Sequence, residues 1–187
     1  MIVGITGLAG SGKSTAALRM RTHHGFHTVK FASPLKNMLR ALGLTERHIE
    51  GDLKEVPCDL LGGQTPRHAM QTLGSAWGRD LISPSLWIDA WKRSVSEHFS
   101  AYPRNPAMTD DLRFQNEAAA LEEFGGIVIR IVRPGQDDTG GHISETEMSQ
   151  IKADFTILND GSKERLWFKV DALIRDLRSS KEGFGDD

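Results

Sequence analysis

The sequence predicts an α/β protein in which a mostly parallel sheet is covered by helices on both faces. A β-rich run that ends in glycine, Ile2 to Thr6, is followed by a glycine-rich turn and then a helical pattern. Strand-like and helix-like segments alternate along the rest of the chain, as in folds with parallel sheets. The composition is that of an ordinary globular protein, with 39% hydrophobic and 26% charged residues among 187.

The first half of the chain is predicted to contain one further strand and four helices. Two of these helices begin with the same signature, an N-cap followed by proline at the first helical position, at Ser33-Pro34 and Thr65-Pro66. Residues 44–63 between them are irregular and polar, so we expect a connecting excursion outside the sheet. The expected elements are helices over residues 13–23, 33–42, 65–78 and 84–99 and a strand over 28–32.

The second half is predicted to contain three strands and two helices. Strands are expected over residues 107–109, 127–132 and 155–158, and helices over 116–124 and 163–177. Right-handed crossovers would place a ligand at the carboxyl ends of the strands. We expect residues 1–187 to form a single domain, with a helical region over about 33–100 and a short lid over about 134–150.

The turn after the first strand has the spacing of a phosphate-binding loop. Gly7 to Ser14 fits the Walker A pattern, and Thr15 follows it. In this motif the backbone N–H groups of Gly10, Ser11 and Gly12 and the helix N-terminus attract phosphates, Lys13 reaches the β and γ phosphates of ATP, and the Ser14 hydroxyl ligates Mg²⁺. A glycine-rich helix cap does not explain the lysine. The motif and its context therefore predict the P-loop NTPase fold.

Acidic residues follow the expected strand at residues 107–109. P-loop enzymes hold the magnesium shell with an acid at the end of an inner strand, so Asp111 is the first candidate and Asp110 the second. Either residue could instead cap the next turn. A water-activating glutamate does not accompany them, which disfavours hydrolysis as the primary reaction.

Four arginines lie at predicted loop or element boundaries: Arg67, Arg79, Arg113 and Arg133. Guanidinium groups suit a reaction that brings two phosphate-bearing substrates together, because negative charge develops at the bridging oxygens. Taken singly, each arginine is more often a solvated surface charge, and the inference depends on the four together, of which we expect about one to be structural only. No general base accompanies Lys13, and a phosphate acceptor needs none because it is already largely dianionic near pH 7. The sequence therefore favours a phosphate-bearing acceptor.

Several other classes of protein are disfavoured by the composition. A net charge of −2 gives no global attraction to nucleic acid, and no apolar run is long enough to cross a bilayer. One cysteine, Cys58, and seven scattered histidines give no metal-ligand spacing. We expect a cytoplasmic enzyme, or one of the host cytoplasm if a phage encodes it, that acts on small nucleotides. A homodimer through the Trp87–Trp91 helix is left open, as is stacking of Trp87 on a base.

Six segments together resemble the bacteriophage deoxynucleoside monophosphate kinases, over residues 1 to about 162. They are the P-loop, Phe31 to Lys36, Thr65-Pro66-Arg67, Trp77 to Asp80, Asp111 to Glu117, with Gln115 where proline is expected, and His142 to Glu145. The resemblance implies transfer of the γ-phosphoryl group of ATP, with Mg²⁺, to a deoxynucleoside monophosphate.

The resemblance also implies roles for single residues. Lys36 and Arg67 would face the acceptor monophosphate, Arg79, Asp80, Trp87 and Asp111 would complete the substrate site, Arg113 and Arg133 would border the transfer site, and Asn159 would lie near the adenine of ATP. Residues 134–141 would form part of a lid over ATP. A plain surface loop and an Asx turn at Asn159 explain these two segments equally well.

Other functions remain to be separated from this one. Another P-loop small-molecule kinase, of the dephospho-coenzyme A kinase or phosphomevalonate kinase type, would share Lys13 and Ser14 but need a different acceptor pocket. A GTP-binding switch would require an Asn-Lys-x-Asp motif, which the chain does not contain. A nucleic-acid-associated ATPase is disfavoured by the balanced charge.

Overall fold

The computed structural model describes residues 1–135 and 143–182. The chain divides into two compact units, one formed by Met1–Val29 with Glu97–Asp187 and the other by Lys30–Ser96. We call them the sheet unit and the helical unit. Among the described helices, none is both long and apolar enough to span a bilayer.

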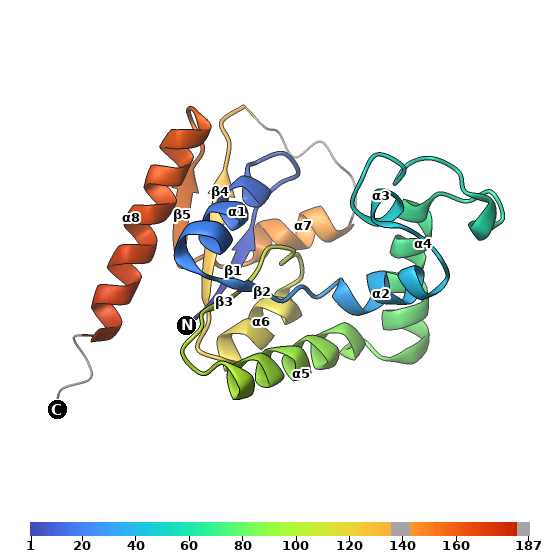
Figure 1. Cartoon of the computed structure of the whole chain (residues 1–187), viewed down its shortest axis with the longest axis horizontal. Helices are drawn as coiled ribbons and strands as arrows, with labels where there is room; N and C mark the ends of the chain where they lie inside the picture. The colour runs from blue at the N-terminus through green and yellow to red at the C-terminus, as the bar shows by residue number, and fades with distance from the viewer. Residues whose placement is uncertain (136–142, 183–187) are drawn as a thin grey trace. The chain divides into compact units, whose positions relative to one another are not determined.

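The sheet unit contains five parallel strands in the order β2-β3-β1-β4-β5 (Figure 1). Its elements are β1 (Ile2–Thr6), α1 (Lys13–His24), β2 (His27–Thr28), β3 (Ala107–Thr109), α6 (Gln115–Glu123), β4 (Ile127–Val132), α7 (Ile143–Gln150), β5 (Phe155–Leu158) and α8 (Lys163–Glu182). Gly4 pairs with Thr109 on one side of β1, and Thr6 pairs with Arg130 on the other. The register therefore brings the loops that follow β1, β3 and β4 to one edge of the sheet.

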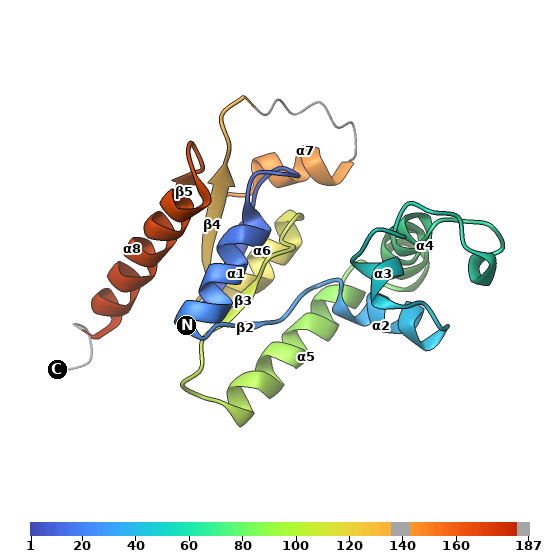
Figure 2. The ribbon, with the colours of Figure 1, turned by 45° about the horizontal axis from the view of Figure 1, so that its top comes forward.

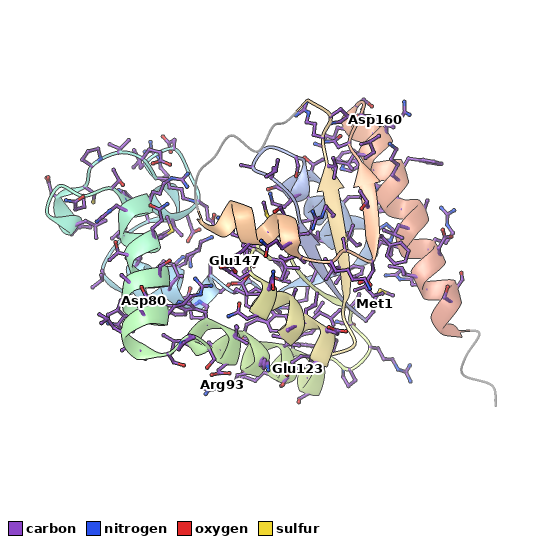
Figure 3. All side chains as sticks on the ribbon, turned by 180° about the vertical axis from the view of Figure 1, so that it is seen from behind. Met1, Asp80, Arg93, Glu123, Glu147 and Asp160 are labelled. Carbon is purple, nitrogen blue, oxygen red and sulfur yellow. The ribbon has the colours of Figure 1, made fainter. Side chains whose placement is uncertain are left out.

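Helices cover both faces of this sheet. On one face Ala16 and Met20 of α1 and Ile174 of α8 join the apolar side chains of the strands in one buried cluster. On the other face α6 lies against β1 and β4, with α7 beside it, as the view from behind shows (Figure 3). A Cβ atom at Gly4 would lie 2.5 Å from the Leu121 side chain, so this glycine permits the close approach of α6.

A charged network joins α1 to α8. Asp171 accepts hydrogen bonds from the Arg19 guanidinium at 2.9 and 2.6 Å and lies 2.7 Å from His24 Nε2. The Arg19 hydrogen bond lowers the pKa of Asp171 well below its usual range, burial opposes this, and His24 adds to it. Arg19 also lies over the Trp167 ring, 5.4 Å from its centroid, and Lys163 lies 4.5 Å from it. The helix that follows the P-loop is thus fixed to the C-terminal helix.

The helical unit has its own apolar core. Its elements are α2 (Ser33–Ala41), α3 (Glu46–Ile49), η1 (Asp59–Leu61), α4 (Pro66–Thr72), η2 (Leu73–Ile82) and the first part of α5 (Leu86–Ala101). The core consists of Leu35, Leu39, Leu44, Ile49, Met70 and Trp87. Phe31 stacks on Trp91 at a centroid distance of 4.5 Å. Trp91 is therefore a core residue at 1% exposure, which removes it as a dimer contact.

The segment η2 is a π-helix that continues α4 (Figure 2). Its two glycines are buried. A Cβ atom at Gly78 would lie 2.5 Å from the Trp87 indole, whereas one at Gly74 would meet only the end of Leu35 at 3.5 Å. The Gly74 carbonyl accepts hydrogen bonds from Trp87 Nε1 at 2.9 Å and from Arg79 Nη1 at 3.2 Å. The wide helix is thus held by one packed indole and by side-chain donors to its own backbone.

The structure differs from the sequence prediction at four places. The strand expected at 28–32 is only His27–Thr28, because the chain turns at Lys30, whose carbonyl accepts from Ser33 N at 3.2 Å. The next helix includes Ser33 and has Ala32 as its N-cap. The helix begun by Thr65 continues as η2 to Ile82. Within the predicted lid, 136–142 lie outside the described residues, and 143–150 form α7, which was not predicted.

Candidate functional site

The loop between β1 and α1 has backbone angles that favour glycine. Gly7, Gly10 and Gly12 have φ values of 139°, 77° and 107°. A Cβ atom at Gly7 would lie 2.3 Å from the Ile131 carbonyl oxygen, and one at Gly12 would lie 2.6 Å from Asn159 Nδ2. The motif glycines are therefore required by the shape of the loop as well as by access to its N–H groups.

Lys13 is the first residue of α1, and its side chain folds back over the loop. The ammonium group donates hydrogen bonds to the carbonyl oxygens of Gly7 at 2.5 Å and Leu8 at 2.7 Å. Ser14 beside it is exposed and Thr15 is partly buried. The cation thus lies at the loop and the Ser14 hydroxyl is open to a ligand, which is the arrangement that phosphate binding needs.

Two hydroxyl groups are buried at this end of β1. Thr6 and Ser11 are 0% and 1% exposed, and their hydroxyl oxygens make no hydrogen bond within the described residues. Since buried polar atoms are rarely left unsatisfied, these hydroxyls mark a place for water or polar ligand atoms under the loop.

Asn159 joins the end of β5 to the P-loop. Its backbone N–H donates to the Val132 carbonyl at 2.7 Å, and its Nδ2 donates to the Ser11 carbonyl at 2.9 Å. The side chain predicted to lie near adenine thus contacts the loop itself. Any contact with adenine remains a prediction.

The residues after β3 form a second part of this edge. Thr109 Oγ1 donates to Asp111 Oδ1 at 2.8 Å, which orients the predicted metal carboxylate. Buried Glu117 accepts hydrogen bonds from the backbone N–H groups of Arg113 at 2.9 Å and Phe114 at 3.2 Å. Glu117 therefore fixes the turn from which Arg113 extends into solvent. The sequence signal for this role of Glu117 was its position as the third residue of a helix, where a glutamate can accept hydrogen bonds from the backbone before the helix.

A pocket of about 250 Å³ lies beside the P-loop at the end of β4. It is lined by Gly7, Leu8, Ser11, Arg130, Ile131, Val132, Arg133, Met148 and Ser149. Arg133 is thereby brought to the same pocket as the start of the P-loop. Arg130 was not predicted, and its guanidinium donates to the carbonyls of Met148 and Ser149 at 3.3 Å and also to that of Ile151. A charged residue inside the apolar run of β4 was the sequence signal for it.

Both cations predicted for the acceptor phosphate lie in the helical unit, and each contacts a carboxylate. Lys36 Nζ lies 2.6 Å from Glu50 Oε1, and Arg67 forms an ion pair with Glu55. The Arg67 backbone N–H also donates to the Lys54 carbonyl at 3.0 Å. The structure therefore places Arg67 next to a further lysine that the sequence had not indicated.

The remaining predicted substrate residues lie on or against η2. Arg79 is partly buried, and Asp80, labelled in Figure 3, is exposed. Trp87 is 4% exposed, its N–H bonds to the Gly74 carbonyl, and its ring packs on Gly78. Its indole is therefore part of the core, and we replace base stacking by a packing role for this residue.

Candidate magnesium ligands are Ser14 and Asp111. The described residues contain no cluster of three or more His, Cys, Asp or Glu side chains that could hold a metal ion. A hydroxyl and a carboxylate from the protein would suit a Mg²⁺ ion whose other ligands are nucleotide phosphates and water. Ser14 and Asp111 both belong to the sheet unit, and their role as ligands remains a prediction.

Comparison with known proteins assigns the chain to a family. The model of the deoxynucleotide monophosphate kinase family matches residues 46–170. The chain belongs to this family. A protein of Acanthamoeba polyphaga mimivirus that is assigned as a deoxynucleotide monophosphate kinase is 35% identical, over 93% of this chain and 96% of that one. The resemblance predicted from the sequence motifs is therefore confirmed.

A phage relative matches over a shorter region. The deoxynucleotide monophosphate kinase of Escherichia phage RB69 is 28% identical, over 58% of this chain and 44% of its own length. The chain thus aligns with somewhat less than half of that phage protein.

A solved structure supports the fold. Shikimate kinase from Aquifex aeolicus superposes with a TM-score of 0.54 over 100% of both chains at 16% identity. The predicted α/β P-loop fold, with a mostly parallel sheet and helices on both faces, is confirmed.

Proposed function

We propose that this protein transfers the γ-phosphoryl group of ATP to a deoxynucleoside monophosphate, giving the deoxynucleoside diphosphate and ADP. Membership of the deoxynucleotide monophosphate kinase family carries this proposal, since the family model covers residues 46–170 and the mimivirus relative matches along nearly the whole chain. The P-loop geometry around Lys13 supplies the donor site that such a reaction requires.

In this proposal the sheet unit binds ATP. The loop N–H groups and the N-terminus of α1 bind the phosphates, and Lys13 exchanges the carbonyls of Gly7 and Leu8 for the β and γ phosphate oxygens. Ser14 and Asp111 would hold Mg²⁺, which neutralises charge on the phosphate oxygens when bound. Asn159 keeps the loop in shape through the Ser11 carbonyl.

The helical unit binds the acceptor in this proposal. Lys36 and Arg67 bind its monophosphate, and Arg79 and Asp80 contribute to the rest of the site. An acceptor phosphate oxygen attacks the γ phosphorus, and the bond to the oxygen that bridges the β and γ phosphates breaks, so that ADP leaves with that electron pair. The attacking oxygen carries no proton in the dianion, so no general base is required.

Arginines balance the charge that develops during transfer. Arg133, which lines the pocket beside the P-loop, and Arg113, held by the Glu117 turn, are proposed to contact the phosphoryl oxygens. Charge-assisted hydrogen bonds that strengthen as charge moves to the bridging oxygen lower the barrier. We propose that these small nucleotides are the protein's partners and that it acts in the cytoplasm where they are made.

A coupled assay of ADP release tests the proposal. ATP and Mg²⁺ are supplied with a panel of ribo- and deoxynucleoside monophosphates and with dephospho-coenzyme A. We expect turnover that depends on a deoxynucleoside monophosphate and that is lost in Arg67→Ala through a higher KM for the acceptor. An exposed arginine of α5, Arg93, labelled in Figure 3, provides the matched control Arg93→Ala. Turnover with dephospho-coenzyme A alone, or none with any monophosphate, would reject the proposal.

A further inference from the structure

Each predicted acceptor cation in the helical unit already contacts an anion of the protein. Lys36 is the clearer case, because its side chain is only 13% exposed while the Glu50 carboxylate that it contacts at 2.6 Å is 44% exposed. Lys36 lies on α2, next to core residue Leu35, and Glu50 directly follows α3, next to core residue Ile49. The packing of these two helices therefore fixes where the pair forms.

The charges of two further lysines act on the same carboxylate. Burial alone would raise the pKa of Glu50, but the hydrogen bond and charge of Lys36 and the charges of Lys30 and Lys54 outweigh it, so that the pKa is lowered. Three lysines from three separate segments thus act on one carboxylate. Lys54 is next to Arg67 through the bond between its carbonyl and the Arg67 N–H.

Lys36 has the chemistry that an exchange of one anion for another requires. Lysine is a common phosphate-binding residue, and it binds as a point charge that can accept one anion in place of another. A carboxylate oxygen and a phosphate oxygen are interchangeable partners for such a group.

We propose that Glu50 is an internal competitor of the acceptor: in the ligand-free protein its carboxylate occupies the position on Lys36 that an oxygen of the acceptor monophosphate takes. This inference rests on the proposed function. It adds Glu50 to the acceptor site as a residue that sets its affinity.

The exchange favours a dianion over weaker anions. Glu50 returns to water at small cost because it is already partly exposed, and an ion pair of this kind contributes about 0–1 kcal/mol. A phosphate dianion presents more negative charge to Lys36 than a carboxylate does. A nucleoside that carries no phosphate cannot replace the carboxylate. Glu50 therefore lowers the affinity of every ligand that binds through Lys36, and a dianion replaces it most readily.

The experiment compares three variants with the wild-type protein. Glu50→Gln removes the charge, and Glu50→Asp keeps the charge but withdraws the carboxylate from Lys36. Asp52→Asn is the matched control, because Asp52 forms an ion pair with Arg47 in the same unit at 2.6 Å, and the charges that act on it are those of Arg47 and His48. KM for each of the four deoxynucleoside monophosphates, KM for ATP and kcat are measured, together with calorimetric binding of inorganic phosphate.

The variants separate two explanations: direct competition for Lys36, and a change in the electrostatic potential that depends only on the charge at position 50. We expect KM for the acceptor to fall roughly threefold in both Glu50 variants, as for loss of a surface ion pair, with kcat and KM for ATP unchanged and with Asp52→Asn equal to the wild-type protein. Inorganic phosphate should bind more tightly by a similar factor. A fall in Glu50→Gln alone would show a field effect and overturn the proposal, as would an unchanged or higher KM in both.

The result is separable from the proposed function. If the wild-type protein shows no turnover with any monophosphate, the kinase proposal fails. Calorimetric binding of inorganic phosphate then tests the role of Glu50 independently. Tighter binding of inorganic phosphate by both Glu50 variants supports the competitor, and equal binding by all four proteins rejects it. If the wild-type protein turns over normally and the variants do not differ from it, only the role of Glu50 is rejected.

Discussion

The two units carry their candidate phosphate-binding cations in different ways. In the sheet unit the site is built from backbone, with a buried strand, three glycines at positive φ and one lysine held against loop carbonyls. In the helical unit it is built from long side chains, Lys36 and Arg67, that are paired with carboxylates. We therefore expect the first site to tolerate almost no change and the second to be adjustable in affinity.

Loss of the P-loop cation should have the largest effect. Lys13→Ala removes the ammonium group that contacts Gly7 and Leu8, and we expect kcat to fall roughly 10²- to 10³-fold because this group stabilises charge on the transferred phosphoryl group. The coupled assay measures the effect, with the exposed residue change Lys152→Ala as control. Turnover within tenfold of wild type would show that the P-loop lysine is not essential.

A glycine in the helical unit tests whether that unit is equally intolerant in its core. Gly78→Ala would place a methyl group 2.5 Å from the Trp87 indole, and we expect a loss of about 1–3 kcal/mol in unfolding free energy. Gly74→Ala, in the same π-helix, meets only Leu35 at 3.5 Å and should be neutral or gain up to about 1 kcal/mol. Urea unfolding followed by circular dichroism measures both. Equal effects would mean that the Trp87 contact does not control η2.

The charged network between α1 and α8 makes the stability of the sheet unit depend on pH. The pKa of Asp171 is lowered chiefly by the Arg19 hydrogen bond, so its stabilisation is present above the unfolded pKa near 4 and is lost as pH falls through the lower folded pKa. We expect Asp171→Asn to cost about 1–2 kcal/mol at pH 7. The difference in unfolding free energy between Asp171→Asn and the wild-type protein should narrow below about pH 4. Urea titrations at pH 7, 5 and 3 would contradict this if the difference stayed constant.

The smallest effect is expected at the contact between β5 and the P-loop. Asn159→Ala removes one hydrogen bond, of about 1 kcal/mol, to the Ser11 carbonyl. We expect KM for ATP to rise roughly fivefold, with KM for the acceptor unchanged. The control is Asn116→Ala at an exposed position of α6. A change in acceptor KM instead would assign Asn159 to the other substrate.

Features that depend on local sequence were predictable. The P-loop follows from glycines whose backbone angles no other residue adopts easily, and the strand Ile127–Val132 follows from a continuous apolar run. The helix begun by Thr65-Pro66 was also expected, and Thr65 Oγ1 does accept from the His68 N–H at 3.1 Å. In each case a few consecutive residues specify the structure.

Features that depend on distant partners were not predictable. In the π-helix Gly78 packs against Trp87, which lies outside the segment, and we did not predict this helix type from residues 73–82. Helix α7 carries a weak apolar pattern, with Met148 buried in it and Ile151 just beyond it, and Arg130 bonds to carbonyls at its end. The ion pair of Lys36 with Glu50 likewise joins two residues that are 14 positions apart in sequence, and their proximity depends on the packing of α2 and α3.

The distribution of tryptophan gives the helical unit an intrinsic optical probe. Trp77, Trp87 and Trp91 lie in the helical unit, whereas Trp167 is the one tryptophan of the sheet unit. Trp87 and Trp91 are almost wholly buried, so their fluorescence emission should shift to longer wavelength when this unit opens. The ring of Trp167 lies against Arg19 and Lys163 and reports on the other unit. Replacing Trp167 by phenylalanine would leave a protein whose emission follows the helical unit alone.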